Sequence, residues 1–576
     1  MQKRERINLV FGLVLVLTTL LVVFFRFYRL GSVPQGLTKD ESYYGYDAYS
    51  ILKTGRDIWG RHLPLYFKST GEYKMNLTYL MVPGVKLFGL SEMTVRLPSA
   101  IFGLLTLFIL FLTLQKFFSN RPLSLALTAA YAFSPLSFGM SRLFYESNTG
   151  LFFIALALLL VFNKRFTLSA IFFALSGYLY NPYRYIGLIL LVLALALHYY
   201  FGRKDSRPVR RLLPLAIYLL IFSPLVIFGT PGGSLKRLGE ELTLQKTSYE
   251  MKINDMRANC LLNFKSPTLA KLCYPFWNKV VLHTSMSASS FLRPLSPEIL
   301  FLENQNEYVI PKGYGVFQSF LLPFYFLGLI WLFGFAKLKP LGDFERLLIL
   351  FGIIASSGIV ASTGNIEIYR HPVLMYLIYL SMSCGAYLFL SFVLQQKRAV
   401  RITISIFFFA LASFQITKYL LTYHLYTQKL PLLFSYDVRE IYEYLETKKD
   451  YQFIVDRKFH GPITASFFWA TDPAYYQENI VWTDPDPWGF INSYRLGNVY
   501  SQTYTLNDLL CKKHADPNVP LRAIVIDDPG QYNPWADLLT HDFSGSLTLH
   551  AVYDIDRLYP FVKEYYPADL CKLTES

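Results

Sequence analysis

The chain has 576 residues, of which 53% are hydrophobic, 17% are aromatic and 16% are charged. This composition is too apolar for a soluble protein, and the chain is too long for a membrane bundle alone. The net charge of +15 would suggest a nucleic-acid partner. Outside the C-terminal third, however, most basic residues lie in short loops between apolar runs, which is a topology signal, so we expect no nucleic-acid partner.

Apolar runs of spanning or near-spanning length predict about eleven transmembrane helices. The first run, Ile7–Phe25, resembles a signal peptide, but it is long and lacks a small-residue cleavage site, so we interpret it as a retained helix. The piece 77–89 is interrupted by Pro83 and is expected to be a re-entrant or interfacial helix. The eleven predicted spans are 7–28, 94–114, 122–140, 149–163, 167–180, 185–202, 212–229, 317–336, 347–363, 372–394 and 402–421.

The basic residues predict how these spans are oriented. With the N-terminus in the cytoplasm, the inner loops carry about eighteen Lys and Arg residues and the short outer loops about three, as the positive-inside rule requires. An odd number of spans then places the C-terminal region outside the cell. We therefore expect a multi-pass protein of the plasma membrane in contact with the lipid bilayer.

Three longer segments lie on the predicted outer face: 29–93, the insertion 230–316, and 422–576. The last of these alternates helix and strand signals, with a helix over Val438–Thr447 and strands over Tyr451–Asp456 and Leu521–Asp528, which suggests an α/β domain. The predicted fold is a polytopic α-helical membrane domain, 1–421, followed by an extracytoplasmic soluble α/β domain, 422–576.

Cysteine usage agrees with this topology. Cys260 and Cys273 share the long outer insertion, Cys511 and Cys571 share the outer soluble domain, and Cys384 lies inside a span. Two pairs in two outer segments indicate two disulfides in an oxidising compartment; the alternative is four free thiols. No spacing of Cys and His residues resembles a zinc site.

The stretch 34–47 places two adjacent carboxylates, Asp40 and Glu41, directly after the first span. Carboxylates beside hydrocarbon are costly unless they are partnered or used, so the pair is a candidate for chemistry. The alternative is an ordinary solvated loop that begins with Asp-Glu.

Each of the three short outer loops carries one arginine close to the membrane and beside tyrosines: Arg142, Arg184 and Arg370. The functional interpretation is phosphate binding, because a guanidinium makes bidentate contacts with phosphate oxygens. The alternative is an interfacial anchor, with the arginines reaching for the surface and the tyrosines in the aromatic belt.

Glu146 adds a third carboxylate near the outer surface. It follows Arg142 by four residues, so a simple helical ion pair is the alternative to a catalytic role. Together, three acids and three arginines on one face suit the transfer of a group from a lipid-linked phosphate to a hydroxyl. A carboxylate would accept the proton of the hydroxyl, and arginine would hold the leaving phosphate.

Part of the chain resembles a known protein family. The segments that carry it are Pro34, Asp40-Glu41, Tyr44, Ala48, Gly55, Phe88-Gly89 and Val95–Gly103, with the Arg-Leu-Pro of 96–98. They resemble the GT-C fold membrane glycosyltransferases, and within them the bacterial branch of the dolichyl-phosphate-mannose protein mannosyltransferase superfamily, which includes the Rgt-like and aminoarabinose transferases. The resemblance covers about the first 200 residues; further on, only Ile366–Pro372 and the run beginning Tyr436–Glu440 are similar.

The resemblance implies a polyprenyl-phosphate sugar donor, an inverting mechanism and an extracytoplasmic active site that transfers the sugar to a hydroxyl acceptor. The family's catalytic acid of the first outer loop maps onto Asp40. The acid of the second loop, often Asp, maps onto Glu146, which is one methylene longer and departs from the pattern. Glu41 completes the predicted acidic set, with Tyr44, Tyr183 and His371 as supporting residues. Some relatives use a divalent metal, and no pattern in this sequence decides whether this chain does.

Two other classes of protein compete with this interpretation. A polytopic lipid or glycan transporter would need ionisable groups or broken helices near the bilayer midplane, whereas the charges here collect at the outer rim. A structural anchor would make the C-terminal domain the working part, but its histidines are scattered and form no nucleophile constellation. The sequence names neither the sugar, the acceptor nor the length of the lipid.

Overall fold

A computed structural model of the chain describes residues 2–68, 77–201, 208–227, 246–263, 268, 271–303, 309–336, 340–363, 367–425, 438–448, 450–455, 461–485, 491–501, 506–517, 523–527, 533–541 and 548–565. The chain forms two compact units, each built from separate segments. The helical unit comprises 1–26, 101–141 and 145–422. The mixed unit comprises 27–100, 142–144 and 423–576, and so joins the predicted first outer loop to the predicted C-terminal domain.

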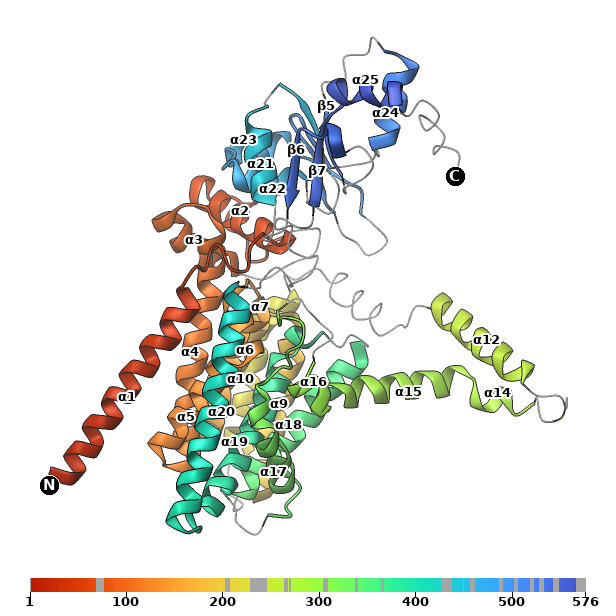
Figure 1. The fold of residues 1–576 in the computed structure, drawn as a ribbon. Coiled ribbons are helices and arrows are strands. Elements are labelled where there is room, and N and C mark those ends of the chain that lie inside the picture. The colour runs from red at the N-terminus through yellow and green to blue at the C-terminus, as the bar shows by residue number, and fades with distance from the viewer. Residues whose placement is uncertain are drawn as a thin grey trace. The chain divides into compact units, whose positions relative to one another are not determined.

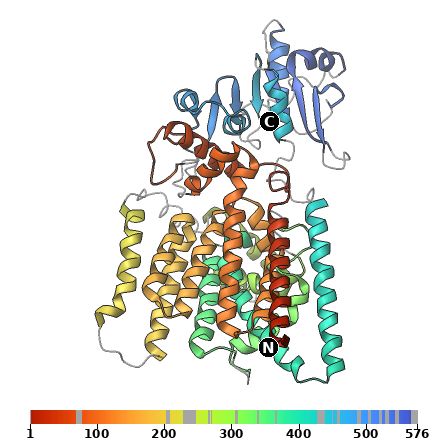
Figure 2. The same ribbon diagram turned by 90° about the vertical axis from the view of Figure 1, so that its left-hand side faces the viewer.

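Helices that pack side by side make up the helical unit (Figures 1 and 2). The closest packed pairs are α17 with α19, α7 with α8, α8 with α9, and α8 with α10. Among the described helices, α1 Gln2–Phe27, α4 Glu92–Phe118, α6 Pro135–Arg142 and α20 Arg398–Leu425 contribute residues to both units. The remaining long helices are α5 Arg121–Ala132, α7 Glu146–Phe162, α8 Phe166–Leu179, α9 Asn181–Phe201, α10 Pro208–Ile227, α12 Lys246–Leu262, α15 Lys279–Leu292, α17 Leu322–Leu332, α18 Asp343–Thr363 and α19 Pro372–Leu394.

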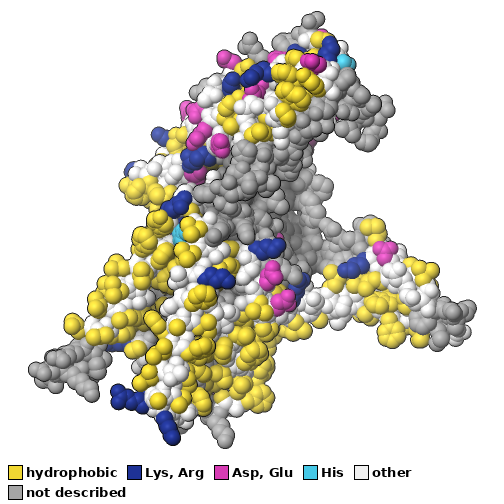
Figure 3. Space-filling view, in the orientation of Figure 1, with side chains coloured by type: hydrophobic (Ala, Val, Ile, Leu, Met, Phe, Trp, Pro, Cys, Tyr) yellow, Lys and Arg dark blue, Asp and Glu magenta, His cyan; other side chains and the backbone are white. Residues whose placement is uncertain are grey.

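All eleven predicted spans coincide with described helices, but the predicted count of eleven is not confirmed. Within the described chain, six helices are long and apolar enough to cross a membrane: α1, α4, α9, α18, α19 and α20. The bent pair α5–α6 would make a seventh, and α7, α8 and parts of α10 and α17 are apolar but shorter. Hydrophobic side chains cover much of the outside of these helices, as a lipid-facing surface requires (Figure 3).

The bend between α5 and α6 measures 61° and has a clear physical support. Arg26, at the end of α1, is wholly buried. Its guanidinium donates to the carbonyl oxygens of Ala132 and Ser137 and to the Ser137 hydroxyl, at 3.0 to 3.2 Å. The carbonyl group of Ala132 is at the end of α5 and lacks a helical partner, and the Arg26 guanidinium supplies one.

The C-terminal part of the mixed unit is built on a seven-stranded mixed sheet, in the order β2-β3-β4-β1-β5-β7-β6. The central strand β1 runs parallel to β4 and to β5, and the remaining pairs are antiparallel. The strands are β1 Gln452–Val455, β2 Val481–Trp482, β3 Ser493–Leu496, β4 Val499–Ser501, β5 Ala523–Asp527, β6 Leu538–His541 and β7 Thr548–Asp554. The predicted helix and both predicted strands of this region are present, as α21 Val438–Glu446, β1 and β5.

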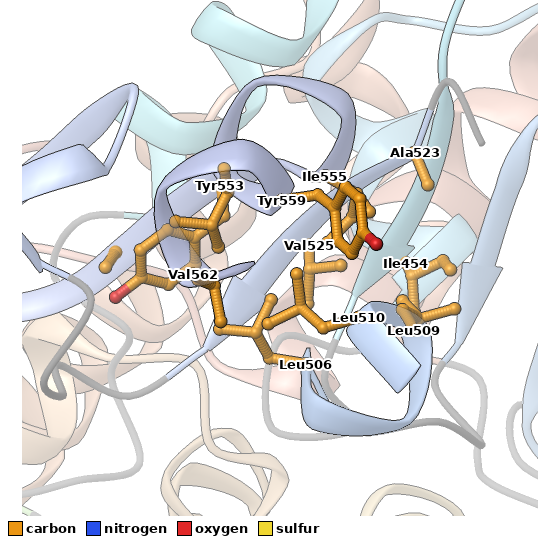
Figure 4. Close-up of a cluster of buried hydrophobic side chains, with 12 residues drawn as sticks. Ile454, Leu506, Leu509, Leu510, Ala523, Val525, Tyr553, Ile555, Tyr559 and Val562 are labelled. Atoms are coloured by element: carbon orange, nitrogen blue, oxygen red, sulfur yellow. The ribbon is translucent and has the colours of Figure 1, made fainter. Parts of the chain in front are cut away.

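One face of the sheet carries the hydrophobic core of the domain (Figure 4). Ile454 of β1, Val525 of β5 and Tyr553 of β7 point into a cluster that α24 Leu506–Ala515 and α25 Ile555–Tyr565 complete. Neighbours along the strands, such as Phe453 and Ile524, are also buried but point to the other face. With both faces buried, the central strands read as continuous apolar runs, which is why the sequence revealed them.

The helix α2, Lys39–Thr54, packs against this domain within the mixed unit, and also against α3 Leu77–Phe88. Its neighbours in the domain are α22 Gly461–Phe468 and α23 Pro473–Asn479. Buried Tyr43 and Tyr46 pack with Ile463, Tyr476 and Leu496 in one apolar cluster. The C-terminal domain, predicted as 422–576, is therefore the platform on which α2 rests.

Gly45 lies where α2 comes closest to α22, and it generates a stability prediction. A Cβ atom at Gly45 would lie 2.6 Å from Cε2 of Phe467 and 2.6 Å from Cγ2 of Val95. We expect Gly45→Ala to lower the melting temperature in detergent, because overpacking costs about 1–3 kcal/mol and outweighs the gain of about 1 kcal/mol in helix propensity. Gly358→Ala in α18 is the control, since nothing lies within 4 Å of its Cβ; an equal rise in melting temperature for both variants would contradict the prediction.

Candidate active site

The N-terminus of α2 is fixed by a capping box. The Thr38 hydroxyl accepts a hydrogen bond from the Glu41 backbone N–H at 3.1 Å, and the Glu41 carboxylate accepts one from the Thr38 N–H at 2.9 Å. The sequence Thr-x-x-Glu is the usual signature of this motif, because each side chain satisfies a backbone donor that has no helical partner. The signature at 38–41 was available in the sequence and locates the start of α2.

The Glu41 carboxylate also forms a buried ion pair with Arg96 of α4. Arg96 Nε donates to Glu41 Oε1 at 2.8 Å, and neither side chain is exposed at all. The same guanidinium donates to the carbonyl oxygens of Leu30, Pro34 and Gly36 at 2.6 to 3.2 Å. One arginine therefore holds both the carboxylate and the irregular segment that leads into α2.

Sequence reasoning did not assign Arg96 to the site, although it stands in the quoted Arg-Leu-Pro motif. A signal was present, because a guanidinium five residues into an apolar helix needs an acidic partner or carbonyl oxygens. The structure supplies both. Glu41 was predicted as a member of the catalytic acids, and the structure instead places its carboxylate among protein donors.

Asp40 has the opposite environment. It is the second residue of α2, directly beside Glu41, and its side chain is exposed. A carboxylate in the first turn of a helix is stabilised by the unpaired backbone N–H groups and by the helix dipole. The capping box and the Arg96 pair thus hold the backbone at Asp40 while its own carboxylate faces outward.

Arg142 lies inside the mixed unit and not at its surface. Its side chain is wholly buried, and it donates to the carbonyl oxygens of Tyr28, Arg29 and Val33 at 2.8 to 3.3 Å. This geometry does not favour the predicted contact with a donor phosphate, which stays a prediction. The helical pair of Arg142 with Glu146 is wrong as an alternative, because α6 ends at Arg142 and α7 begins at Glu146.

Phe144, two residues after Arg142, contacts α2. The Phe144 N–H donates to Glu41 Oε1 at 3.4 Å, and the Phe144 ring lies 4.6 Å from the ring of Tyr44. Tyr44 is fully buried. The predicted supporting residue Tyr44 therefore packs against Phe144 and does not face solvent.

The other predicted residues belong to the helical unit and gather around the start of α7. Glu146 is the first residue of α7 and is partly exposed. The Ser147 hydroxyl donates to the Tyr369 carbonyl oxygen at 2.9 Å, and the Tyr183 hydroxyl donates to the Ser147 carbonyl oxygen at 2.7 Å. These bonds bring the second and third arginine-bearing loops to the N-terminus of α7.

The two remaining arginines are partly exposed at this end of the helical unit. Arg370 forms an ion pair with Glu367, in the 3₁₀ turn Ile368–Arg370 before α19. Arg184 lies in the first turn of α9, and its Nε donates to the Gly177 carbonyl oxygen at 3.3 Å. His371 is buried directly before α19. The predicted site residues are therefore divided, with Asp40, Glu41, Tyr44 and Arg142 in the mixed unit and the others in the helical unit.

The cysteines follow the prediction where they are described. Cys260 and Cys273 form a disulfide, and Cys384 is a buried free thiol in α19. Cys511 is disulfide-bonded, and its predicted partner Cys571 lies outside the described residues. Among the residues that the structure describes, no group of three His, Cys, Asp or Glu side chains is placed to hold a metal ion.

A second buried carboxylate, Asp47, lies two turns along α2. Its Oδ1 accepts a hydrogen bond from the Ile58 N–H at 2.9 Å. The neighbouring Asp57 is also buried; it accepts from the Arg61 N–H at 2.8 Å and forms an ion pair with the Arg61 guanidinium at 2.6 Å. These two acids fasten the loop after α2 to the helix that carries Asp40. Burial, and then the negative charge of Asp57, raise the pKa of Asp47 well above its usual range.

No protein-family model and no curated protein matches the sequence. Among solved structures, the apo oligosaccharyltransferase of Archaeoglobus fulgidus matches with a TM-score of 0.48 and 13% identity, over 80% of this chain and 63% of that one. ArnT from Cupriavidus metallidurans, solved with undecaprenyl phosphate, matches with a TM-score of 0.46 and 12% identity, over 94% of this chain and 97% of that one.

The chain thus spans less than two thirds of the length of the oligosaccharyltransferase and nearly the whole length of ArnT. Both are GT-C fold glycosyltransferases, so the structural neighbours of the chain are of the kind that the sequence motifs predicted.

The buried Glu41–Arg96 pair generates a second prediction. Glu41→Gln removes the carboxylate charge and leaves the Arg96 guanidinium buried without its counter-charge, which costs about 3–5 kcal/mol. We expect a large fall in melting temperature. Glu443→Gln is the matched control, because Glu443 pairs with Arg439 at 3.5 Å on the surface of α21, where such a pair contributes about 0–1 kcal/mol. Similar losses in the two variants would contradict the importance of the buried pair.

A third prediction follows from Asp47. Because its folded-state pKa lies above its unfolded value, folding favours the protonated carboxyl, and stability is lost as pH rises from the unfolded pKa of about 4. Asp47→Asn keeps an oxygen acceptor for Ile58 and removes the titration. We expect the variant to exceed the wild type in melting temperature at pH 8 and to approach it at pH 4. If the melting temperatures of the two proteins changed in parallel between pH 4 and pH 8, the raised pKa of Asp47 would be refuted.

Proposed function

We propose that the protein is an integral-membrane, inverting glycosyltransferase. It moves a sugar from a polyprenyl-phosphate donor to a hydroxyl acceptor on the outer face of the plasma membrane. The observation that carries this proposal is the N-terminus of α2: Glu41 is locked by Arg96 and Thr38, while the adjacent Asp40 is presented outward on a rigid backbone. The proposal also draws on the motif resemblance of the first outer loop and on the apolar helices.

Asp40 is the proposed general base. Its carboxylate takes the proton of the acceptor hydroxyl while the acceptor oxygen bonds to the anomeric carbon. The bond from that carbon to the phosphate oxygen breaks on the opposite face, through an oxocarbenium-like state, so that the configuration inverts. The proton ends on Asp40, and the bonding electrons leave with the lipid phosphate. Because a phosphate leaves as a stable anion, the reaction needs no strong general acid.

The lipid phosphate is assigned to Arg184 and Arg370. Both side chains are partly exposed in the helical unit, and guanidinium groups suit phosphate oxygens geometrically. Arg142 is given a different role, because its guanidinium is committed to the backbone of 28–33. Glu146 begins α7 beside the loop of Arg370 and is the second acidic group of the proposed site. It lies in another unit than Asp40, and we assign it no individual step.

Glu41 is proposed as a positioning residue. It touches Arg96, Thr38 and Phe144 and is wholly buried, so it does not act on a substrate. Its contribution is to hold the first turn of α2. The predicted pair of adjacent acids then divides into one working carboxylate and one structural carboxylate.

The alternative function is a polytopic transporter of lipids or glycans. Such a protein would place ionisable groups near the bilayer midplane. Among the described candidate spans, the buried charged side chains are Arg26, Glu92 and Arg96, and each lies within five residues of a helix end. This distribution favours chemistry at the rim over passage through the bundle.

The experiment that tests the proposal is a transfer assay in membranes with a panel of radiolabelled polyprenyl-phosphate sugars. We expect wild-type membranes to move label to lipid, glycan or protein, and Asp40→Asn to reduce transfer at least about a hundredfold, because a general base is lost. Its melting temperature should stay near that of the wild type, since Asp40 is exposed.

Glu440→Gln is the matched control, because Glu440 is also an exposed acid in the first turn of a helix of the mixed unit. It should transfer at the wild-type rate. Near-normal turnover in Asp40→Asn would remove Asp40 from the reaction. If no donor is consumed and labelled lipid instead crosses the bilayer, the transporter interpretation takes its place.

A further inference from the structure

A disulfide-bonded helical arm extends from the helical unit (Figure 1). It consists of α12, the short helix α14 Cys273–Phe276, and α15. In the ribbon view, α15 leaves the bundle beside α18, and the structure packs α15 against α18. The proposed reaction uses no residue of this arm.

The arm has a defined internal structure. The Cys260–Cys273 disulfide joins the end of α12 to the start of α14. Arg257 Nε donates to the Trp277 carbonyl oxygen at 2.6 Å, and its guanidinium lies 5.4 Å from the centre of the Tyr274 ring. Ile253 and Cys273 are buried between the helices. The surface that the arm presents is therefore held in place by several contacts.

That surface is unusually apolar. Hydrophobic side chains show along the arm in the space-filling view (Figure 3). At the disulfide end the exposed fractions are 84% for Leu262, 64% for Phe276 and 74% for Val280. Other exposed apolar side chains of the arm are Met251, Leu272, Tyr274, Val281, Met286 and Leu292. A protein surface in water rarely gathers so many large apolar groups without a partner.

The helix α15 is amphipathic. Val280, Val281, Ala288, Phe291 and Leu292 recur at helical spacing on one side. Lys279 and His283 lie away from this side, whereas Leu282 and Ser290 are buried. The helix α15 packs against α18, a candidate span on which Phe351 and Ile354 are also exposed.

Charge identifies the partner. Between 251 and 292 the sequence contains five basic residues and one acidic residue, Asp255. Lys252, Lys271 and Lys279 are exposed beside the apolar side chains. Apolar side chains mixed with Lys, Arg, Tyr and Trp are typical of segments that lie in a bilayer interface and attract anionic headgroups. A soluble acidic protein would match the charge, but it would not account for the packing of the arm against a candidate membrane span.

We propose that the arm formed by α12, α14 and α15 is an interfacial membrane anchor. Its apolar side, centred on Phe276, Val280 and Val281, enters the headgroup region of the bilayer that the helical unit spans, and its lysines bind anionic phospholipids. The proposal does not depend on the glycosyltransferase function.

The test uses the full-length protein in nanodiscs. Single cysteines are introduced by Val281→Cys and, as the matched control on the opposite side of α15, by His283→Cys. Each is labelled with an environment-sensitive maleimide fluorophore, and the intact Cys260–Cys273 bond is checked by peptide mapping. The native free thiol Cys384 is buried, so the unmodified protein supplies the labelling background. Brominated lipid tails quench from the bilayer side, and iodide quenches from water.

We expect lipid quenching at Val281→Cys to exceed that at His283→Cys at least about threefold, with iodide showing the reverse order, as for an interfacial amphipathic helix. Replacing phosphatidylglycerol by phosphatidylcholine should reduce the lipid quenching, and Lys252→Glu with Lys271→Glu should abolish this lipid dependence. Equal quenching at the two positions would overturn the proposal. So would a Val281 label that neither quencher reaches, because a protein partner would then cover the surface.

Discussion

The ion pair between Glu41 and Arg96 is the interaction on which the rest of the candidate site depends. A buried pair of charges stabilises a structure only when its geometry is good and further hydrogen bonds satisfy both partners. Here the carboxylate also closes the capping box of α2, and the guanidinium also binds the carbonyls of 30–36. One contact thereby sets the position of a helix, of its leading segment and of the exposed carboxylate at Asp40.

Buried arginines play the same structural part elsewhere in the chain. Arg26 supports the bend between α5 and α6, and Arg142 holds the backbone of 28–33. Arg142 binds carbonyl oxygens of the irregular segment after α1, and Arg26 binds the carbonyl oxygen of Ala132 at the end of α5. Carbonyl groups in these positions lack a partner within a helix. Arginine suits this task because its guanidinium offers several donors in a fixed plane and keeps its charge when buried.

Much of the fold could be predicted from the sequence, because its strongest signals are local. Long apolar runs located the helices, and short continuous apolar runs located β1 and β5. Two cysteines in one predicted outer segment predicted the Cys260–Cys273 bond. What the sequence could not show depends on distant contacts. Nothing local indicates that Arg142 is buried, or that Tyr43 and Tyr46 of α2 pack with Ile463 and Tyr476. The predicted count of eleven spans is not confirmed for a simpler reason: several of the described apolar helices are shorter than a bilayer requires.

The composition of the mixed unit has a consequence for how the protein is made. The Ser42 hydroxyl lies 3.1 Å from the Thr464 hydroxyl, although 422 positions separate them in the chain. Synthesis proceeds from the N-terminus, so α2 is made long before the residues that cover it exist. Throughout that interval its tyrosine-rich face has no partner from the C-terminal domain. The part of the molecule that carries Asp40 is thus completed last, and a chain released early would carry Asp40 without the platform that holds it.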